Sequence, residues 1–387
     1  MKIIRKLICC ILCAAMLTAG LPWTAYAEEQ STEESALSTP KAAVLMEAET
    51  GQVLYSVNAQ ARLPMASITK VMALLVLADK IDAGELQLTD TVKASSYASS
   101  AEGSVIWLDP GEEMTAAELL EAVIVSSAND ACIALAEHTA GSEAAFVKLM
   151  NKRAKDMKLK NTKFTGCVGF DADGHYSSAE DIAIMTAELM TKEYYRGWLL
   201  TWLDYLRGGE TQLLNTNKLV RYYDGILGGK TGTTDGAGCC LTACAQRGDM
   251  RLIAVVLGCG EDPERFDKAE ELLDYGFSGF ERFTPETDSR ELQPIPVERG
   301  EIKEVKPVVK SLGDCIIKKG RSGSVKYEYT FVEKLEAPVE KGQFLGEFLV
   351  TLDGNEVFRS DIVAREEVRR MSFGMYLLRI LGELIAF

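Results

Sequence analysis

Residues 226–238 read ILGGKTGTTDGAG, and this stretch decides how the whole chain is interpreted. Two apolar runs follow it, CCLTACA at 239–245 and MRLIAVVLG at 250–258, with an Arg-Gly-Asp turn between them. Runs of this length joined by a short turn predict a pair of antiparallel strands that are largely buried. We therefore expect the KTGT motif at 230–233 to precede the first of two adjacent strands.

Hairpin and helix patterns precede this stretch. Residues 42–56 form two strand-like runs around a Thr-Gly turn, which is typical of a hairpin. After Pro64 the apolar residues recur as they do in a buried helix. Thr115 and Glu118 form a capping box ahead of an apolar run, and such a box marks the start of a helix.

Two more helices complete the first domain. Ser178 and Asp181 resemble a helix start, and another helix is expected from about Pro263 to Tyr275. A hairpin, several helices and then a second hairpin predict an α+β fold over residues 41–283, because alternating βαβ units would show strands between the helices.

The composition changes near Phe283. Residues 284–365 are rich in short runs of Val, Ile, Thr and Tyr with Gly and Pro between them, and they predict a small all-β domain. Residues 366–387 instead form an amphipathic pattern, which we expect to be a helix in the membrane interface. Its apolar face comprises Phe373, Leu377, Ile380, Leu381, Leu384 and Phe387. A helix packed on the β-domain or mediating dimers is the alternative.

The N-terminus has the pattern of a secretory signal. Residues 1–27 contain a charged start, an apolar run and an Ala-Tyr-Ala cleavage sequence, and residues 28–40 read as a polar, flexible leader. We therefore expect an exported protein that is attached peripherally to the outer face of the cell membrane. An uncleaved N-terminal anchor is the alternative.

Charge and cysteine content exclude some classes of function. The formal net charge is −15, and removing Lys2, Arg5 and Lys6 with the signal makes it −18. Such acidity argues against nucleic acid as a partner, because phosphate binding needs clustered basic residues. Seven cysteines remain after residue 27, an odd number without a Cys-x-x-Cys pair. We expect no disulfide framework, no metal site and no cofactor.

Three short motifs point to nucleophilic catalysis, namely SITK at 67–70, SAN at 127–129 and KTGT at 230–233. On a helix, positions i and i+3 share a face, so Ser67 and Lys70 can meet. A serine needs a base, and a lysine can act as one if burial and a second cation such as Lys230 lower its pKa. The chain has only His138 and His175; we expect His138 to be structural and His175 to be structural or to line the rim of the site.

The ordered motifs resemble those of penicillin-binding proteins and serine β-lactamases. Within that superfamily the chain is similar to the low-molecular-mass D-alanyl-D-alanine carboxypeptidases, peptidase family S11. The similarity covers nearly the whole chain, and KTGTTDGAG at 230–238 is its most specific part. It implies a β-lactamase/transpeptidase-like domain, with an antiparallel sheet and a helical cluster, followed by the small β-domain and the tail helix.

The resemblance also implies roles for individual residues. Ser67 would be the acylated nucleophile, Lys70 its general base and Ser127 a proton relay to the leaving D-alanine. The substrate-binding set would be Asn129, Lys230, Thr231, Gly232, Thr233 and Arg265. The oxyanion would lie between the backbone N–H groups of Ser67 and Thr233. Thr231 and Arg265 would hold the carboxylate of the leaving group, and a strand edge near Lys230 would pair with the extended peptide.

The implied activity is removal of the terminal D-alanine from peptidoglycan stem pentapeptides, with penicillins as inhibitors. Two departures from the family pattern are GCVGF at 166–170 and Ala128 in place of glycine. A class A-like β-lactamase is one alternative, although residues 157–167 lack the acidic residue that such enzymes use for deacylation. A catalytically silent wall-binding homologue is another. An endopeptidase activity, a sporulation role and the oligomeric state stay open.

Overall fold

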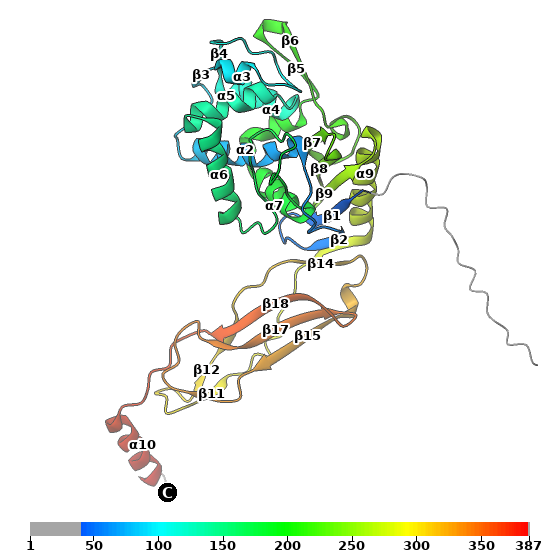
Figure 1. The fold of residues 1–387 in the computed structure, drawn as a ribbon. Helices are drawn as coiled ribbons and strands as arrows, with labels where there is room; N and C mark the ends of the chain where they lie inside the picture. Colours follow the sequence, from blue (N-terminus) through cyan, green and yellow to red (C-terminus); the bar gives the residue numbers. More distant parts are fainter. Residues whose placement is uncertain (1–39, 386–387) are drawn as a thin grey trace, which may run out of the picture. The chain divides into compact units, whose positions relative to one another are not determined.

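The first domain is organised around a five-stranded antiparallel sheet with the order β2-β1-β9-β8-β7 (Figure 1). This computed structural model describes residues 40–385, so the predicted signal peptide and nearly all of the leader lie outside the described residues. The strands are β1 (Ala42–Glu47), β2 (Val53–Val57), β7 (Ile226–Thr234), β8 (Gly238–Arg247) and β9 (Met250–Cys259). Both hairpins expected from the sequence are present.

The middle strands are mostly apolar because helices cover both faces of the sheet. In β9, Ile253 and Val255 contribute to one buried cluster, whereas Ala254 and Val256 contribute to another. Helix α9 (Asp262–Gly279) packs on β8 and β9, and α7 (Ala179–Leu189) packs on β1 and β9. A strand buried on both sides loses the alternation of polar and apolar residues, and this explains the continuous run at 250–258.

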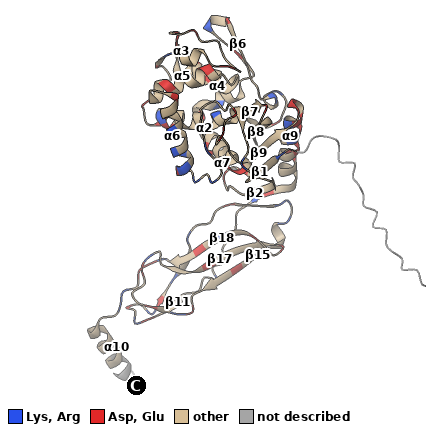
Figure 2. Ribbon diagram, viewed as in Figure 1, with Lys and Arg blue, Asp and Glu red and all other residues tan. Residues whose placement is uncertain are grey.

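The remaining helices form a cluster around α2 (Lys70–Asp82), which continues a 3₁₀ turn at Ala66–Thr69. Figure 2 shows Lys and Arg residues on α6, whereas α2 is mostly uncharged. Residues 70–78 of α2 are buried. The other helices are α3 (Ser96–Ser99), α4 (Ala116–Val125), α5 (Asn129–Ala140), α6 (Glu143–Asp156) and α8 (Arg196–Leu200). Two small hairpins pair β3 (Thr91–Lys93) with β4 (Glu113–Thr115) and β5 (Leu203–Leu206) with β6 (Thr211–Leu214).

The expected helix starts are present. Thr115 accepts from the N–H of Glu118 while the Glu118 carboxylate bonds back to Thr115, which completes the capping box of α4. The Ser178 side chain accepts from the N–H of Asp181 at the start of α7. The helix expected to end near Tyr275 continues to Gly279.

The KTGT motif precedes the strands β8 and β9, as predicted, and it also lies within a strand of its own. This strand, β7, begins at Ile226 rather than near Lys230, and Lys230 pairs with Thr242 of β8. The register shifts between Ile226 and Gly228, which is a β-bulge. Gly229 has a φ of 152°, and a Cβ there would lie 2.0 Å from the Thr242 carbonyl oxygen. Only glycine permits this close approach.

The second domain is all-β, as expected. A four-stranded sheet has the order β13-β18-β17-β15, a three-stranded one the order β12-β11-β16, and β10 pairs with β14. The strands are β10 (Phe280–Phe283), β11 (Ile295–Glu298), β12 (Glu304–Val305), β13 (Pro307–Val309), β14 (Cys315–Lys318), β15 (Val325–Phe331), β16 (Leu335–Glu336), β17 (Phe344–Leu352) and β18 (Asn355–Ala364). The boundary at 283/284 stays a prediction.

Within the tail, the helix is shorter than residues 366–387. Helix α10 spans Phe373–Ile385, whereas Val368 is buried in the β-domain core and forms a β-bridge with Val339. The residues just before the helix therefore belong to the β-domain. Phe373 of α10 is 83% exposed and Leu378 is 70% exposed. Across residues 40–385, none of the helices has the length and apolarity needed to cross a bilayer.

Candidate active site

The Lys70 amine is the centre of the candidate site. The 3₁₀ turn at 66–69 places Ser67 one turn before Lys70, whose side chain is completely buried. Its Nζ donates to Ser67 Oγ at 2.8 Å, to Asn129 Oδ1 at 2.6 Å and to the Val168 carbonyl at 3.2 Å. Three separate segments therefore converge on one nitrogen, and one of the acceptors is the expected nucleophile.

Burial increases the fraction of Lys70 that is neutral near pH 7, and only the neutral amine can accept a proton. Burial lowers the pKa of Lys70 to about 8, because a buried ammonium loses its hydration. We expected the charge of Lys230 to contribute to this shift, but burial alone accounts for the lowering. Repulsion from Lys70 instead acts on Lys230, whose pKa is held well below its usual value by burial and then by Lys70 and Arg265.

The SAN motif connects α4 to α5. Ser127 lies in the left-handed region with a φ of 64°, which is strained for a serine and turns its backbone sharply between the helices. Its buried Oγ has no hydrogen-bond partner among the described residues, so it is available to a substrate or a proton. Asn129 is held in place because its Nδ2 donates to the Glu102 carbonyl at 2.6 Å.

Strand β7 forms the opposite wall and is an edge strand of the sheet. A Cβ at Gly232 would lie 2.9 Å from the backbone nitrogen of Ser67, so glycine is required where the strand passes the nucleophile. Thr233 follows Gly232 in β7 and lines the same cleft as Ser67. The Thr231 hydroxyl donates to Thr216 Oγ1 at 2.7 Å.

Arg265 reaches the same wall from the first turn of α9. It is buried, and its Nη1 donates to Thr233 Oγ1 at 2.8 Å and to the Gly232 carbonyl at 3.1 Å. Its Nη2 pairs with Asp262. The structure therefore places the guanidinium against Thr233 rather than against Thr231, which we expected to be its partner for a carboxylate.

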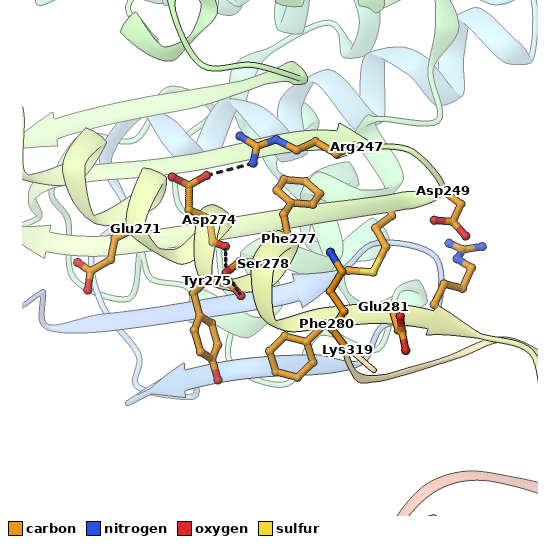
Figure 3. A pocket seen from close by; sticks show the side chains of 12 residues that line it. Arg247, Asp249, Glu271, Asp274, Tyr275, Phe277, Ser278, Phe280, Glu281 and Lys319 are labelled. Carbon is orange, nitrogen blue, oxygen red and sulfur yellow. Dashed lines mark hydrogen bonds and ion pairs between the residues drawn. The ribbon is translucent and has the colours of Figure 1, made fainter. Parts of the chain in front are cut away.

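These residues surround a cleft of about 220 Å³. Lys70 and Lys230 lie buried behind it, and the other predicted residues line it. The full lining is Ser67, Gly103, Ser104, Ser127, Asn129, Val168, Gly169, Phe170, Thr216, Thr231, Gly232, Thr233, Thr234 and Arg265. A larger cavity of about 990 Å³ lies elsewhere, near the C-terminal end of α9 (Figure 3). Arg247 pairs there with Asp274, and none of its lining residues comes from the three motifs.

The segment 166–171 contributes more than its sequence suggests. A Cβ at Gly169 would lie 1.9 Å from the Ala66 carbonyl, so this glycine lets the segment pass close beneath the nucleophile. The Asp171 carboxylate then accepts from Thr234 Oγ1 at 2.7 Å and from the Gly236 N–H at 2.9 Å. Asp171 therefore ties one wall of the cleft to the end of β7. No local sequence pattern identified this contact.

The two histidines lie outside the cleft lining. His175 is buried, its Nε2 lies 2.8 Å from Thr69 Oγ1, and its Nδ1 accepts from the Thr165 N–H at 3.1 Å. Burial lowers its pKa, so the ring is neutral near pH 7. It supports the 3₁₀ turn that presents Ser67, which is a structural role. His138 lies in the last turn of α5.

Comparison with known proteins identifies the family. A model of the D-alanyl-D-alanine carboxypeptidase family, peptidase S11, matches residues 28–261, and one of the penicillin-binding protein 5 C-terminal domain matches residues 280–370. The chain belongs to the D-alanyl-D-alanine carboxypeptidase family. This membership favours the carboxypeptidase interpretation over a β-lactamase or a silent homologue.

Several known carboxypeptidases align with most of this chain. It is 38% identical to the D-alanyl-D-alanine carboxypeptidase DacF of Bacillus subtilis, over 98% of each chain. It is 36% identical to DacC of Escherichia coli, over 90% of this chain and 89% of that one. Penicillin-binding protein 5 of Haemophilus influenzae superposes with a TM-score of 0.79 at 32% identity, covering 86% of this chain and 98% of that one.

Asp171 offers a test of how the cleft walls are held. We expect Asp171→Ala to slow acylation by a fluorescent penicillin about tenfold, roughly 1.4 kcal/mol, because the segment that positions Lys70 loses two hydrogen bonds. Asp173→Ala removes the same charge two residues away and should leave the rate unchanged. Equal rates for both variants would show that the tie to β7 does not position the base.

Proposed function

We propose that this carboxypeptidase removes the terminal D-alanine from peptidoglycan stem pentapeptides through an acyl-enzyme on Ser67. The observation that carries the proposal is the 2.8 Å hydrogen bond between the Ser67 hydroxyl and the fully buried Lys70 amine. Membership of the carboxypeptidase family supports the reaction class. The residue roles rest on the geometry of the cleft.

In the acylation step, neutral Lys70 accepts the proton of Ser67, and Oγ attacks the carbonyl carbon of the peptide bond between the two D-alanines. The backbone N–H groups of Ser67 and Thr233 would stabilise the oxyanion. The C–N bond then breaks as Ser127 donates its hydroxyl proton to the leaving amine and receives in its place the proton that Lys70 took from Ser67. Water later attacks the ester carbonyl and gives a proton to neutral Lys70. The ester C–O bond breaks, this proton passes to Ser67 Oγ, and the shortened peptide is released.

Substrate binding uses the free edge of β7. An extended stem peptide can add to this edge as a further strand, because β7 pairs only with β8 among the described strands. The carboxylate of the terminal D-alanine would bind near Arg265 and the hydroxyl of Thr233, and Asn129 would contact the peptide. A penicillin places its own carboxylate and carbonyl in the same positions, and this similarity explains inhibition.

Export and membrane attachment complete the proposal. The N-terminal sequence has the pattern of a secretory signal, and the substrate lies outside the cytoplasm. Helix α10 exposes the large apolar side chains of Phe373, Tyr376 and Leu378. Apolar residues exposed along a short helix favour insertion into the membrane interface, parallel to the surface.

The first test concerns the nucleophile. We expect Ser67→Ala to abolish both labelling by a fluorescent penicillin and the release of D-alanine from diacetyl-Lys-D-Ala-D-Ala, because no hydroxyl remains to form the ester. Release is measured by mass spectrometry, and circular dichroism checks the fold. Ser311→Ala, at an exposed position, serves as the control. Labelling that persists in Ser67→Ala would refute the assigned nucleophile.

The second test is the pH dependence of acylation. With a pKa of about 8 for Lys70, roughly a tenth of the molecules carry the neutral amine at pH 7. The base must be neutral, so the acylation rate constant should rise about tenfold per pH unit below pH 8 and level off above it. Stopped-flow measurement with a penicillin reports this. A flat profile between about pH 6 and 9 would contradict Lys70 as the base.

The third test concerns the tail. A chain ending at Met371 keeps the bridge between Val368 and Val339 but lacks α10. We expect it to release D-alanine at the full rate and to stop sedimenting with phosphatidylglycerol vesicles. Leu378→Glu in the full chain should weaken vesicle binding in the same direction. Unchanged vesicle binding by the shortened chain would place the membrane contact elsewhere.

A further inference from the structure

The outer edge of β15 is an unpaired strand edge. This seven-residue strand is last in the order β13-β18-β17-β15, and its ladder is with β17 alone (Figure 1). The Val325 N–H donates to the Ser322 carbonyl in the preceding turn, and within residues 40–385 the backbone groups of residues 326–331 form no hydrogen bond outside the ladder with β17. An exposed edge of this length presents a row of free N–H and C=O groups, and it is a template for a further strand.

The two faces of β15 differ in chemistry. Val325, Tyr327, Tyr329 and Phe331 alternate along one face, and Lys326, Glu328 and Thr330 along the other. Tyr327 stacks on the buried Phe348 ring at 6.0 Å between centroids, yet it remains 40% exposed. A partner strand would therefore cover aromatic surface on one face and meet charges on the other.

The charges select one way for this strand to pair with a second copy of itself. When the two strands overlap fully, Glu328 lies on the two-fold axis and faces the second copy's Glu328. These two negative charges repel each other. With Lys326 on the two-fold axis, two lysines meet. With Tyr327 on the axis, each Lys326 lies opposite the second copy's Glu328, so two opposite-charge pairs form. With Tyr329 on the axis, Glu328 meets only Thr330.

We propose that two copies of this chain associate through β15, antiparallel, with Tyr327 on the two-fold axis. This register also sets Tyr327 beside its own counterpart and Val325 beside Tyr329, and such cross-strand pairs are stabilising. A lysine on an edge strand ordinarily discourages pairing. Lys326 disfavours the register in which it lies on the two-fold axis, and it favours the register in which it lies opposite the second copy's Glu328. The partner is therefore a second copy, chosen by charge complementarity.

The fold does not use these charges for another purpose. Inside the sheet, Lys326 faces Thr351 and Glu328 faces Leu349, and neither charge forms an ion pair within the described part of the chain. Reversing either charge therefore leaves the domain intact. One strand pair is smaller than the standard interface of a permanent complex, so we expect a monomer–dimer equilibrium that depends on concentration.

Charge reversal tests the register. In sedimentation of the full mature chain in a non-ionic detergent, Lys326→Glu or Glu328→Lys alone should raise the dimer dissociation constant about tenfold, because each creates two like-charge pairs. The double variant exchanges the charges and should restore the original value. Lys341→Glu makes the same change in charge at an exposed position and should leave the dimer dissociation constant unchanged. It controls for net charge and for self-association of the tail.

Cross-linking tests the axis. Residues directly opposite have Cα atoms about 4.5–5.5 Å apart, which is within reach of a disulfide. Tyr327→Cys should therefore give a covalent dimer under mild oxidation, whereas Glu328→Cys alone should not, because its counterpart is more than about 7 Å away. The seven native cysteines are buried thiols, so the unaltered chain is the background control.

A concentration-independent monomer, or single and double charge variants that dimerise equally, would overturn the proposal. The proposal would also be overturned if Glu328→Cys gave a covalent dimer and Tyr327→Cys did not. If the edge instead binds a strand of another protein, the charge exchange will fail to restore self-association, which also overturns the proposal. Penicillin labelling of every variant verifies that the catalytic domain is folded, and this readout is independent of dimerisation.

Discussion

The removal of one lysine amine from water is the constraint on which the site depends. A buried ammonium is costly unless acceptors surround it, and Lys70 finds three of them, on Ser67, Asn129 and Val168. The same burial lowers its pKa to about 8, so the group that is expensive to bury becomes useful as a base. The Lys70 amine keeps these acceptors only if three segments are correctly placed: the start of α2, the α4–α5 connection and the segment 166–171.

The second requirement is that two walls of the cleft meet at Ser67, the proposed nucleophile. Gly232 lets the edge strand pass within contact distance of the Ser67 backbone, and Gly169 lets the other wall pass beneath it. Each position excludes a side chain for steric reasons, so the cleft is assembled largely from backbone. Arg265 and Asp171 then bond to the β7 wall from α9 and from the 166–171 segment. The two glycines therefore allow the walls of the cleft to approach each other, and the hydrogen bonds of Arg265 and Asp171 hold the walls in place.

Local patterns predicted the fold class, the hairpins and the helix starts, because periodicity and caps such as Thr115 depend on neighbours in sequence. The contact between Ser67 and Lys70 also follows from helical spacing. The contacts of Asp171 and Thr216 join residues far apart in the chain, and no short pattern reports them. The first residues of β7 were missed because glycines normally weaken a strand, whereas Gly229 lies in a strand that needs one.

One consequence arises from the acceptor at residue 168 being a backbone carbonyl. Any amino acid supplies that oxygen, provided that Gly169 keeps the turn, so sequence drift at this position leaves the base undisturbed. The neighbouring side chains of Val168 and Phe170 nevertheless line the cleft. Selectivity for different peptides can therefore evolve here separately from the catalytic amine. The GCVGF sequence can therefore depart from the family pattern and still supply the backbone acceptor for Lys70.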